Sequence, residues 1–213
     1  MWTHIRRSII FCLFWLVLLG LVYPLAGVGV SQLFFRHQAQ GSVAANGSTL
    51  IGQDWSQATC PGHLRGSCVF QGRPDALGPY SDTGTYKGDN PTGHAGDNPL
   101  VANGTAGGSA ATNLGPRSQV LVTNTKDLIA YWQRRGVNPT SDLVTTSGSG
   151  LDPDITPQDA LAEIPMVSRA TGIPASRLKA LVDQQTQGME LGFLGSPYVN
   201  VLQLNEALAK LEA

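Results

Sequence analysis

The chain has 213 residues, of which 42% are hydrophobic and 14% charged, and its formal net charge is -1. Charged residues make up about 25% of an average soluble domain, so this composition indicates a large apolar segment. Binding to a phosphate backbone needs a surplus of Lys and Arg, and the charge balance therefore argues against nucleic acid as a partner. The length allows one membrane segment and one ordinary domain, and excludes a large multidomain enzyme.

The apolar segment lies at the N-terminus, where residues 8–35 contain no Asp, Glu, Lys or Arg. As a helix this stretch would be about 42 Å long, and a bilayer core is about 30 Å thick. We therefore expect a transmembrane anchor, with a kinked or loosely wound second half because of Pro24, Gly27 and Gly29. Gly20, Gly27 and Gly29 would also let a partner helix approach closely.

A cleaved signal peptide is the alternative interpretation of this segment. Arg6 and Arg7 precede the apolar run in the way that a signal peptide's basic region precedes its apolar region. The run is longer than the usual span of about 7 to 15 residues, and no clean Ala-x-Ala cleavage pattern follows it. These two features favour a retained anchor.

Charges on the two flanks of the anchor predict its orientation. His4, Arg6 and Arg7 precede it, whereas Arg36 stands on the other flank. The positive-inside rule then places the N-terminus in the cytoplasm. The predicted division is a cytoplasmic N-terminus over residues 1–7, the anchor over 8–35, a polar juxtamembrane neck over 36–46 and an extracytoplasmic domain over 47–213.

Two of the three cysteines lie in the extracytoplasmic part. Cys60 and Cys68 flank a loop that contains Pro61 and Gly62, and in an oxidising compartment they could form a disulfide. Two unpaired loop thiols remain the alternative, because spacing alone does not establish connectivity. Cys12 lies within the anchor and is interpreted as a small apolar residue.

The extracytoplasmic domain begins with a loop-rich half. Up to Pro116 the chain is rich in Gly, Pro, Asn and Asp, which favours loops and short strands. Within it Gly88-Asp89-Asn90-Pro91 recurs as Gly96-Asp97-Asn98-Pro99, which are turn sequences. Asp89, His94 and Asp97 could bind a hard cation, but turns have the same composition, so we assign no metal site.

The second half is more regular and predicts an α/β or α+β domain. Capping residues and Pro positions indicate helices, and apolar or alternating runs indicate strands. Pro165 is expected to break or kink its helix. The expected elements are a helix over Lys126–Arg135 capped by Thr125 and ended by Gly136, a strand over Leu143–Thr146, a helix opened by Thr156 and Pro157, a helix from Pro174 to about Thr186, a strand over Val199–Leu204 and a closing helix over Asn205–Leu211.

Common catalytic signatures are absent from the sequence. It has no phosphate-binding P-loop, no His-Glu-x-x-His zinc site and no Gly-x-Ser-x-Gly nucleophile elbow, so no catalytic residue is assigned. The run Ser147-Gly148-Ser149-Gly150 ahead of Asp152 is the best candidate for a small ligand, because backbone N–H groups of such a turn can bind an anion. A tight structural turn explains the same residues.

Several segments, taken in order, resemble the KdpC subunits of bacterial high-affinity potassium-importing Kdp ATPases. The longest run, Asp142–Pro157, is the most specific. Two departures stand out, since the family commonly has His where Asp154 stands and has shorter segments in place of 59–68 and 81–105. The matching segments are the N-terminal anchor, Gly47–Gln53, Phe70–Pro74, Gly107–Ser109, Asn113–Pro116, Asp142–Pro157 and Val199–Asn205.

The resemblance implies a noncatalytic, single-pass subunit of the bacterial inner membrane. Its partners would be a channel-like potassium-translocating subunit and a P-type ATPase subunit, which handle K⁺ and Mg-ATP. No cofactor is implied for the chain itself, and it lacks the Asp-Lys-Thr sequence that a P-type pump phosphorylates. An independent membrane-tethered enzyme or ligand-binding module is the alternative hypothesis.

The family is also described as a catalytic chaperone that raises the nucleotide affinity of the ATPase subunit, with the Ser/Gly-rich run as a nucleotide contact. The predicted orientation opposes direct contact, because it places residues 147–150 outside and ATP is inside. We therefore expect assembly and stabilisation, with the domain covering the potassium entrance.

Overall fold

The computed structural model describes residues 1–213 except 54, 56–57, 75–110 and 213. The chain divides into two compact units, Met1–Val43 and Ala44–Ala213, which are described separately. The segments around Asp89, His94 and Asp97, and the departure at 81–105, lie outside the described residues.

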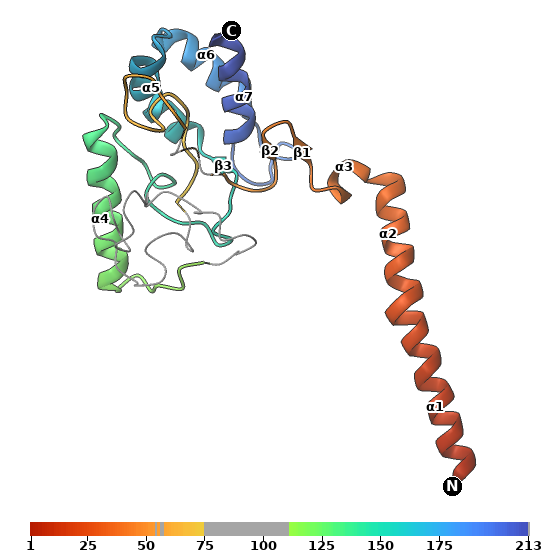
Figure 1. The fold of residues 1–213 in the computed structure, drawn as a ribbon. Helices are drawn as coiled ribbons and strands as arrows, with labels where there is room; N and C mark the ends of the chain where they lie inside the picture. Colours follow the sequence, from red (N-terminus) through yellow and green to blue (C-terminus); the bar gives the residue numbers. More distant parts are fainter. Residues whose placement is uncertain (54, 56–57, 75–110, 213) are drawn as a thin grey trace. The chain divides into compact units, whose positions relative to one another are not determined.

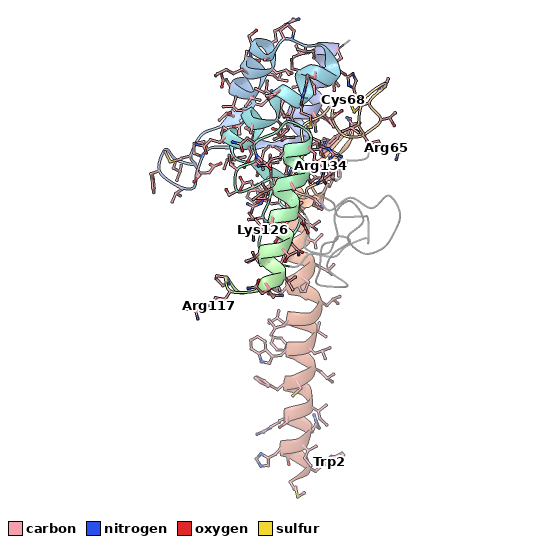
Figure 2. All side chains as sticks on the ribbon, turned by 90° about the vertical axis from the view of Figure 1, so that its left-hand side faces the viewer. Trp2, Arg65, Cys68, Arg117, Lys126 and Arg134 are labelled. Carbon is pink, nitrogen blue, oxygen red and sulfur yellow. A yellow bond between two sulfur atoms is a disulfide. The ribbon has the colours of Figure 1, made fainter. Side chains whose placement is uncertain are left out.

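The first unit is dominated by one continuous helical run from Trp2 to Phe34, which is long and apolar enough to cross a membrane (Figure 1). Its apolar side chains are exposed along the whole run, from Trp2 onward (Figure 2). Apolar groups on all sides are the pattern of a lipid-facing helix. The run consists of α1 (Trp2–Val17), the π-helical η1 (Leu18–Val22) and α2 (Tyr23–Phe34), and the short α3 (Arg36–Ala39) follows it.

The irregular turn of this run lies before Pro24. In η1 the N–H of Tyr23 donates to the carbonyl of Leu18, five residues earlier. Pro24 has no N–H, and a wider turn is one way for a helix to accommodate it. The sequence predicted a loosely wound second half, but Gly27 and Gly29 lie in the regular helix α2, and the widened turn includes Gly20 instead.

In its described residues, the second unit combines four helices with very short strands. Its main sheet is antiparallel, in the order β3-β5-β4, with Val199 of β5 opposite both Ile155 and Thr186. Helix α6 packs against α5 and α7, and all three contact β5 (Figure 1). The elements are α4 (Gln119–Arg134), β3 (Asp154–Ile155), α5 (Pro157–Thr171), α6 (Ala175–Gln185), β4 (Thr186–Gln187), β5 (Tyr198–Asn200) and α7 (Val201–Glu212), preceded by the hairpin β1 (Val43–Ala44) and β2 (Gly47–Ser48).

The predicted helices α5 and α6 are confirmed. Thr156 caps α5 by accepting a hydrogen bond from the Asp159 N–H, and Pro157 occupies the first helical position. Of the two effects expected of Pro165, a break or a kink, the break does not occur, because α5 continues through it to Thr171. Pro165 lies on the exposed face, where water can satisfy the carbonyl that loses its hydrogen bond.

Three sequence-based boundaries are wrong. Helix α4 begins at Gln119 and is capped by Ser118, not by Thr125, so the apolar run before Thr125 is helical. Residues 143–146 form turns instead of a strand, because the Leu143 carbonyl accepts from the Trp132 indole and the Val144 N–H donates to Ser141. Only the first two residues of the expected strand Val199–Leu204 are extended, and α7 begins at Val201.

The core of the second unit joins the helices to the loop-rich half, which contributes Phe70 and the partly buried Trp55. Trp132 of α4 is fully buried, and its indole N–H donates to the Leu143 carbonyl at 2.8 Å. Phe70, which belongs to no helix or strand, is also fully buried. The core therefore depends on contacts between distant segments. Its most deeply buried members include Phe70, Trp132, Leu143, Ile155, Val167, Leu178, Val199, Leu204 and Leu208.

The loop between Cys60 and Cys68 is closed by a disulfide in the structure, with the two Cα atoms 5.6 Å apart. Within the loop the Ser67 hydroxyl donates to the Leu64 carbonyl at 2.6 Å. The Cys12 thiol is free and lies in the apolar helix. A loop with few apolar contacts gains order from such a bond, because the bond restricts the unfolded chain.

Glu163 of α5 is fully buried, and its Oε2 accepts a hydrogen bond from the Gln71 N–H at 2.9 Å. Burial raises the pKa of this carboxyl well above its usual value; the Gln71 hydrogen bond opposes the shift and the nearby Asp159 adds to it. The folded state therefore favours the protonated form, and the stability it contributes is lost as the pH rises through the folded-state pKa.

We predict that Glu163→Gln flattens this part of the pH dependence, because the amide oxygen can still accept from Gln71 and the side chain no longer titrates. The parent should lose stability relative to the variant as the pH rises from about 4.3, the usual Glu pKa. The urea midpoints of unfolding of the parent and of Glu163→Gln, measured at several pH values, test this difference in stability. Glu212→Gln, at an exposed position, is the control. Parallel curves for parent and Glu163→Gln would contradict the prediction.

Candidate functional site

Four of the sequence segments singled out above meet in the second unit. The Gly52 N–H donates to the Leu151 carbonyl at 2.8 Å, and the Val201 N–H donates to the Pro153 carbonyl at 3.0 Å. Asn205 of α7 makes two hydrogen bonds to the Phe70 backbone, accepting from its N–H at 2.9 Å and donating to its carbonyl at 2.8 Å. The segments form one connected structure around residues 142–157.

Gly52 is required by a close approach of two backbones. A Cβ at this position would lie 2.7 Å from the Asp152 carbonyl oxygen, a backbone atom that cannot move away cheaply. The neighbouring Asn200 side chain ties the same region together, because it donates to the Thr49 carbonyl at 2.9 Å and to the Asp154 carboxylate at 2.8 Å. Burial raises the pKa of Asp154, and the Asn200 hydrogen bond opposes this shift.

Arg73 provides a positively charged side chain to this site and pairs with two carboxylates. Its guanidinium lies 3.4 Å from Asp142 and 3.6 Å from Asp152, and it donates to the Thr146 carbonyl at 3.3 Å. The ion pairs are mostly shielded from solvent, since the Arg73 side chain is only 20% exposed. Arg73 therefore holds both ends of the 142–152 segment at one point.

Buried carboxylates complete this network. Asp159 accepts from the N–H groups of Thr140 and Asp142 at 3.0 and 3.1 Å, and from the Thr156 hydroxyl at 3.0 Å. Asp142 in turn accepts from the Thr156 N–H at 2.9 Å. Two carboxylates thus satisfy the backbone of an irregular segment at the beginning of α5.

The Ser147–Gly150 run forms a turn that uses its own hydroxyls. The Gly150 N–H donates to Ser147 Oγ at 2.9 Å, the Leu151 N–H donates to Ser149 Oγ at 3.1 Å, and the two hydroxyl oxygens are 3.2 Å apart. Gly150 has a φ of 70°, whereas Gly148 is not among the glycines with positive φ. Asp152 accepts from the Asp154 N–H at 3.1 Å, which continues the turn.

This geometry favours a structural turn over an anion site. Both N–H groups at Gly150 and Leu151 are directed at hydroxyls of the turn, and the carboxylates of Asp142 and Asp152 stand near it. The hollow beside the turn, lined by Trp55, Arg73 and their neighbours, has a volume of about 20 Å³. Ligand pockets start at about 300 Å³, and this hollow has room for about one water molecule.

A larger hollow of about 290 Å³ lies where the disulfide loop meets the ends of α4 and α5. It is lined by His63, Arg134, Arg135 and Arg169, and Figure 2 shows Arg134 at the end of α4. Arg169 donates to the Arg135 carbonyl at 2.6 Å, and Arg135 stacks 3.6 Å above the Tyr131 ring. Basic side chains at helix C-termini are a common stabilising arrangement, so this hollow has a structural explanation.

The glycines of the apolar run are free of contacts within their own unit. A Cβ at Gly20, Gly27 or Gly29 would meet nothing within 4 Å. Gly27 and Gly29 are two residues apart in a regular helix and so point about 200° apart around its axis. A single partner helix could therefore contact one of these two but not both.

The family described as "KdpC: K+-transporting ATPase, c chain" matches residues 5–210. The chain belongs to the KdpC family. It is 38% identical over 218 residues to the potassium-transporting ATPase KdpC subunit of Methylorubrum extorquens, and 41% over 218 residues to that of Methylorubrum populi; both alignments cover 99% of this chain and 98% of the relative. The Bradyrhizobium diazoefficiens subunit is 37% identical with complete coverage of both chains.

Membership of the KdpC family agrees with the absence of assigned catalytic residues, because KdpC is a noncatalytic subunit of the Kdp ATPase. The long-range polar contacts of Arg73, Asp159, Glu163 and Asn205 are not predicted from the sequence. The available signal was the position of these residues, since Glu163 and Asn205 fall on apolar helix faces where a polar side chain needs a buried partner.

We predict that Gly150→Ala and Gly148→Ala differ in stability. At a φ of 70° a Cβ costs about 1–2 kcal/mol, which lowers the thermal midpoint of a unit of this size by roughly 2–4 °C per kcal/mol. Gly148→Ala should change the midpoint little, because nothing lies within 4 Å of the added Cβ. Thermal unfolding of the full-length variants in detergent measures both, and equal midpoints for the two variants would refute the turn geometry.

Proposed function

We propose that this chain is an accessory subunit that assembles with a channel-like potassium-translocating subunit and a P-type ATPase subunit in the bacterial inner membrane, and stabilises their complex. The observation that carries the proposal is similarity along the full length to chains named potassium-transporting ATPase KdpC subunits. In this proposal the partner subunits bind K⁺ and Mg-ATP, whereas this chain contributes protein–protein contacts with them.

A role in raising the nucleotide affinity of the ATPase subunit would be exerted through those contacts and not by holding ATP. Three features support this form of the proposal: the hydroxyls of Ser147 and Ser149 accept from N–H groups of their own turn, carboxylates flank it, and the adjoining hollow is small. A triphosphate beside Asp152 would need a cation to offset the repulsion.

The proposed orientation has residues 1–7 in the cytoplasm and 47–213 outside. Arg6 and Arg7 at the start of the apolar helix support it through the positive-inside rule. The bond between Cys60 and Cys68 supports it independently, because disulfides persist in extracytoplasmic compartments.

The apolar helix is proposed to contact a partner helix as well as to anchor the chain. Lipid provides no hydrophobic driving force for helix association, so close packing at small residues must supply it. Gly20 and Gly27 are the proposed contact positions, and Gly29, which points away from Gly27, is a matched control.

We predict that the tagged full-length chain brings two large membrane subunits with it in mild detergent. Gly27→Leu should lower their recovery several-fold and Gly29→Leu should not, while both variants stay in the membrane fraction. Recovery of the unaltered chain alone would refute the accessory role and favour an independent tethered enzyme or binding module. Equal recovery with both Leu variants would exclude this helix face as the contact.

We predict that a reporter fused after Gly47 is active only if it works outside the cytoplasm, because the basic residues hold the N-terminus inside. Alkaline phosphatase and a fluorescent protein that fails to mature when exported form a matched pair of reporters. Activity of the cytoplasmic reporter alone would reverse the orientation and restore the nucleotide-site interpretation of Ser147–Gly150.

A further inference from the structure

The connection between β4 and β5, residues 188–197, exposes four large apolar side chains within six positions. Leu191 is 81% exposed and Phe193 71%, and Met189 and Leu194 are each about half exposed, at 45% and 49%. In Figure 2 this connection projects from the second unit. A contiguous exposed apolar patch marks an interaction surface more often than a scattered exposed residue does.

The connection has a defined shape. Glu190 and Leu194 form an antiparallel bridge with two hydrogen bonds of 2.9 Å, and the Gly192 N–H donates to the Met189 carbonyl at 3.1 Å. The C-terminal end of the connection is fixed in the core, because it continues into β5, which contains the fully buried Val199. We call residues 189–194 the apolar tip.

Leu191 adopts a φ of 53°, in the left-handed region. A bulky residue rarely occurs there, because its Cβ approaches the following carbonyl, and Gly or Asn would avoid the cost. Backbone strain is therefore accepted where the fold holds the most exposed large apolar side chain among the described residues of the second unit away from its own core. That arrangement is explained if the side chain has a use outside the unit.

We propose that the apolar tip inserts into an apolar socket on the extracytoplasmic face of a membrane-embedded partner subunit. This inference rests on the proposed function, and it identifies the surface through which the second unit contacts the complex.

The amino-acid composition of the apolar tip argues against insertion into a lipid surface. Interfacial segments combine apolar side chains with Lys or Arg on a polar face and often with Trp or Tyr at the interface, and residues 188–195 contain none of these four residue types. Their one charged residue, Glu190, is acidic and so provides no electrostatic attraction to anionic lipids. Apolar side chains around one carboxylate fit a protein socket that contains a cationic or hydrogen-bond-donating group.

The area of the tip argues against a second copy of this chain. Four side chains at these exposures offer roughly 400–500 Å², whereas a stable interface between free proteins needs about 800 Å² from each partner. A contact of this size suffices if another element already holds the partners together.

The membrane helix provides that second attachment and limits where the partner can be. Residues 35–43, between α2 and the second unit, can span about 30 Å at most. The second unit therefore samples a small volume near the membrane, and a subunit embedded there is presented to the tip at high effective concentration.

The first experiment places a photoactivatable phenylalanine at position 193 of the full-length chain, expressed with its proposed partners, and a matched probe at Leu64, an exposed leucine in the disulfide loop. The inference expects the position-193 probe to crosslink to an extracytoplasmic segment of a co-purifying membrane subunit, identified by peptide mapping, with several-fold higher yield than the probe at 64. Crosslinks to lipid only, to a second copy of this chain, or to no partner would each overturn it.

The second experiment compares Leu191→Asn/Phe193→Ser with Leu64→Ser. Asn tolerates the left-handed backbone, so the double variant removes the two most exposed side chains of the apolar tip without adding strain. Partner recovery in detergent should fall about tenfold for the double variant and stay unchanged for Leu64→Ser, while the thermal midpoints match the parent. Undiminished recovery with the double variant would refute the inference, whereas failure of the unaltered chain to recover partners would refute the proposed function itself.

Discussion

The segment between α4 and α5 has almost no regular secondary structure, so its backbone polar groups must be satisfied by side chains. Asp159 and Asp142 accept from three of its N–H groups, those of Thr140, Asp142 and Thr156, and Arg73 joins Asp142 to Asp152. Unpaired buried carboxylates would be expensive, which makes the network cooperative: each member is stable because the others are in place. The packing of Trp132 on Leu143 and the position of the Ser147–Gly150 turn both depend on it.

Parts of this fold follow from local signals in the sequence. The helix α5 was predictable because Thr156, Pro157 and Asp159 form a complete start signal, and α6 because Pro174 fixes its beginning. The beginning of α4 was not, since Ser118 and Thr125 are both acceptable caps and the apolar residues between them also suit a strand. For α7 the run from Val199 alternates like a strand, yet Val201, Leu204 and Leu208 share a buried helix face, and tertiary packing decides between them.

The position of the candidate site in the chain could be predicted from the sequence, but the pairing of its residues could not. The sequence directed attention to Ser147–Gly150, which proves to be one turn of a larger arrangement, but it gave no means of pairing Arg73 with acids about 70 and 80 residues away. Long-range ion pairs and amide pairs have no local pattern. The exposed tip around Leu191 was equally hidden, because an apolar run in a sequence is usually part of the core, and only the fold shows that this one is not.

The two hydrogen bonds between Asn205 and Phe70 join residues 135 positions apart. Phe70 lies in the loop-rich half of the unit and has no partner strand, so this half cannot take its place in the core until α7 has been synthesised. Contacts of such long sequence separation slow folding, because the intervening chain must be closed before they form. Helix α7 is synthesised after the other described elements of the unit, so the final packing of the core waits for it.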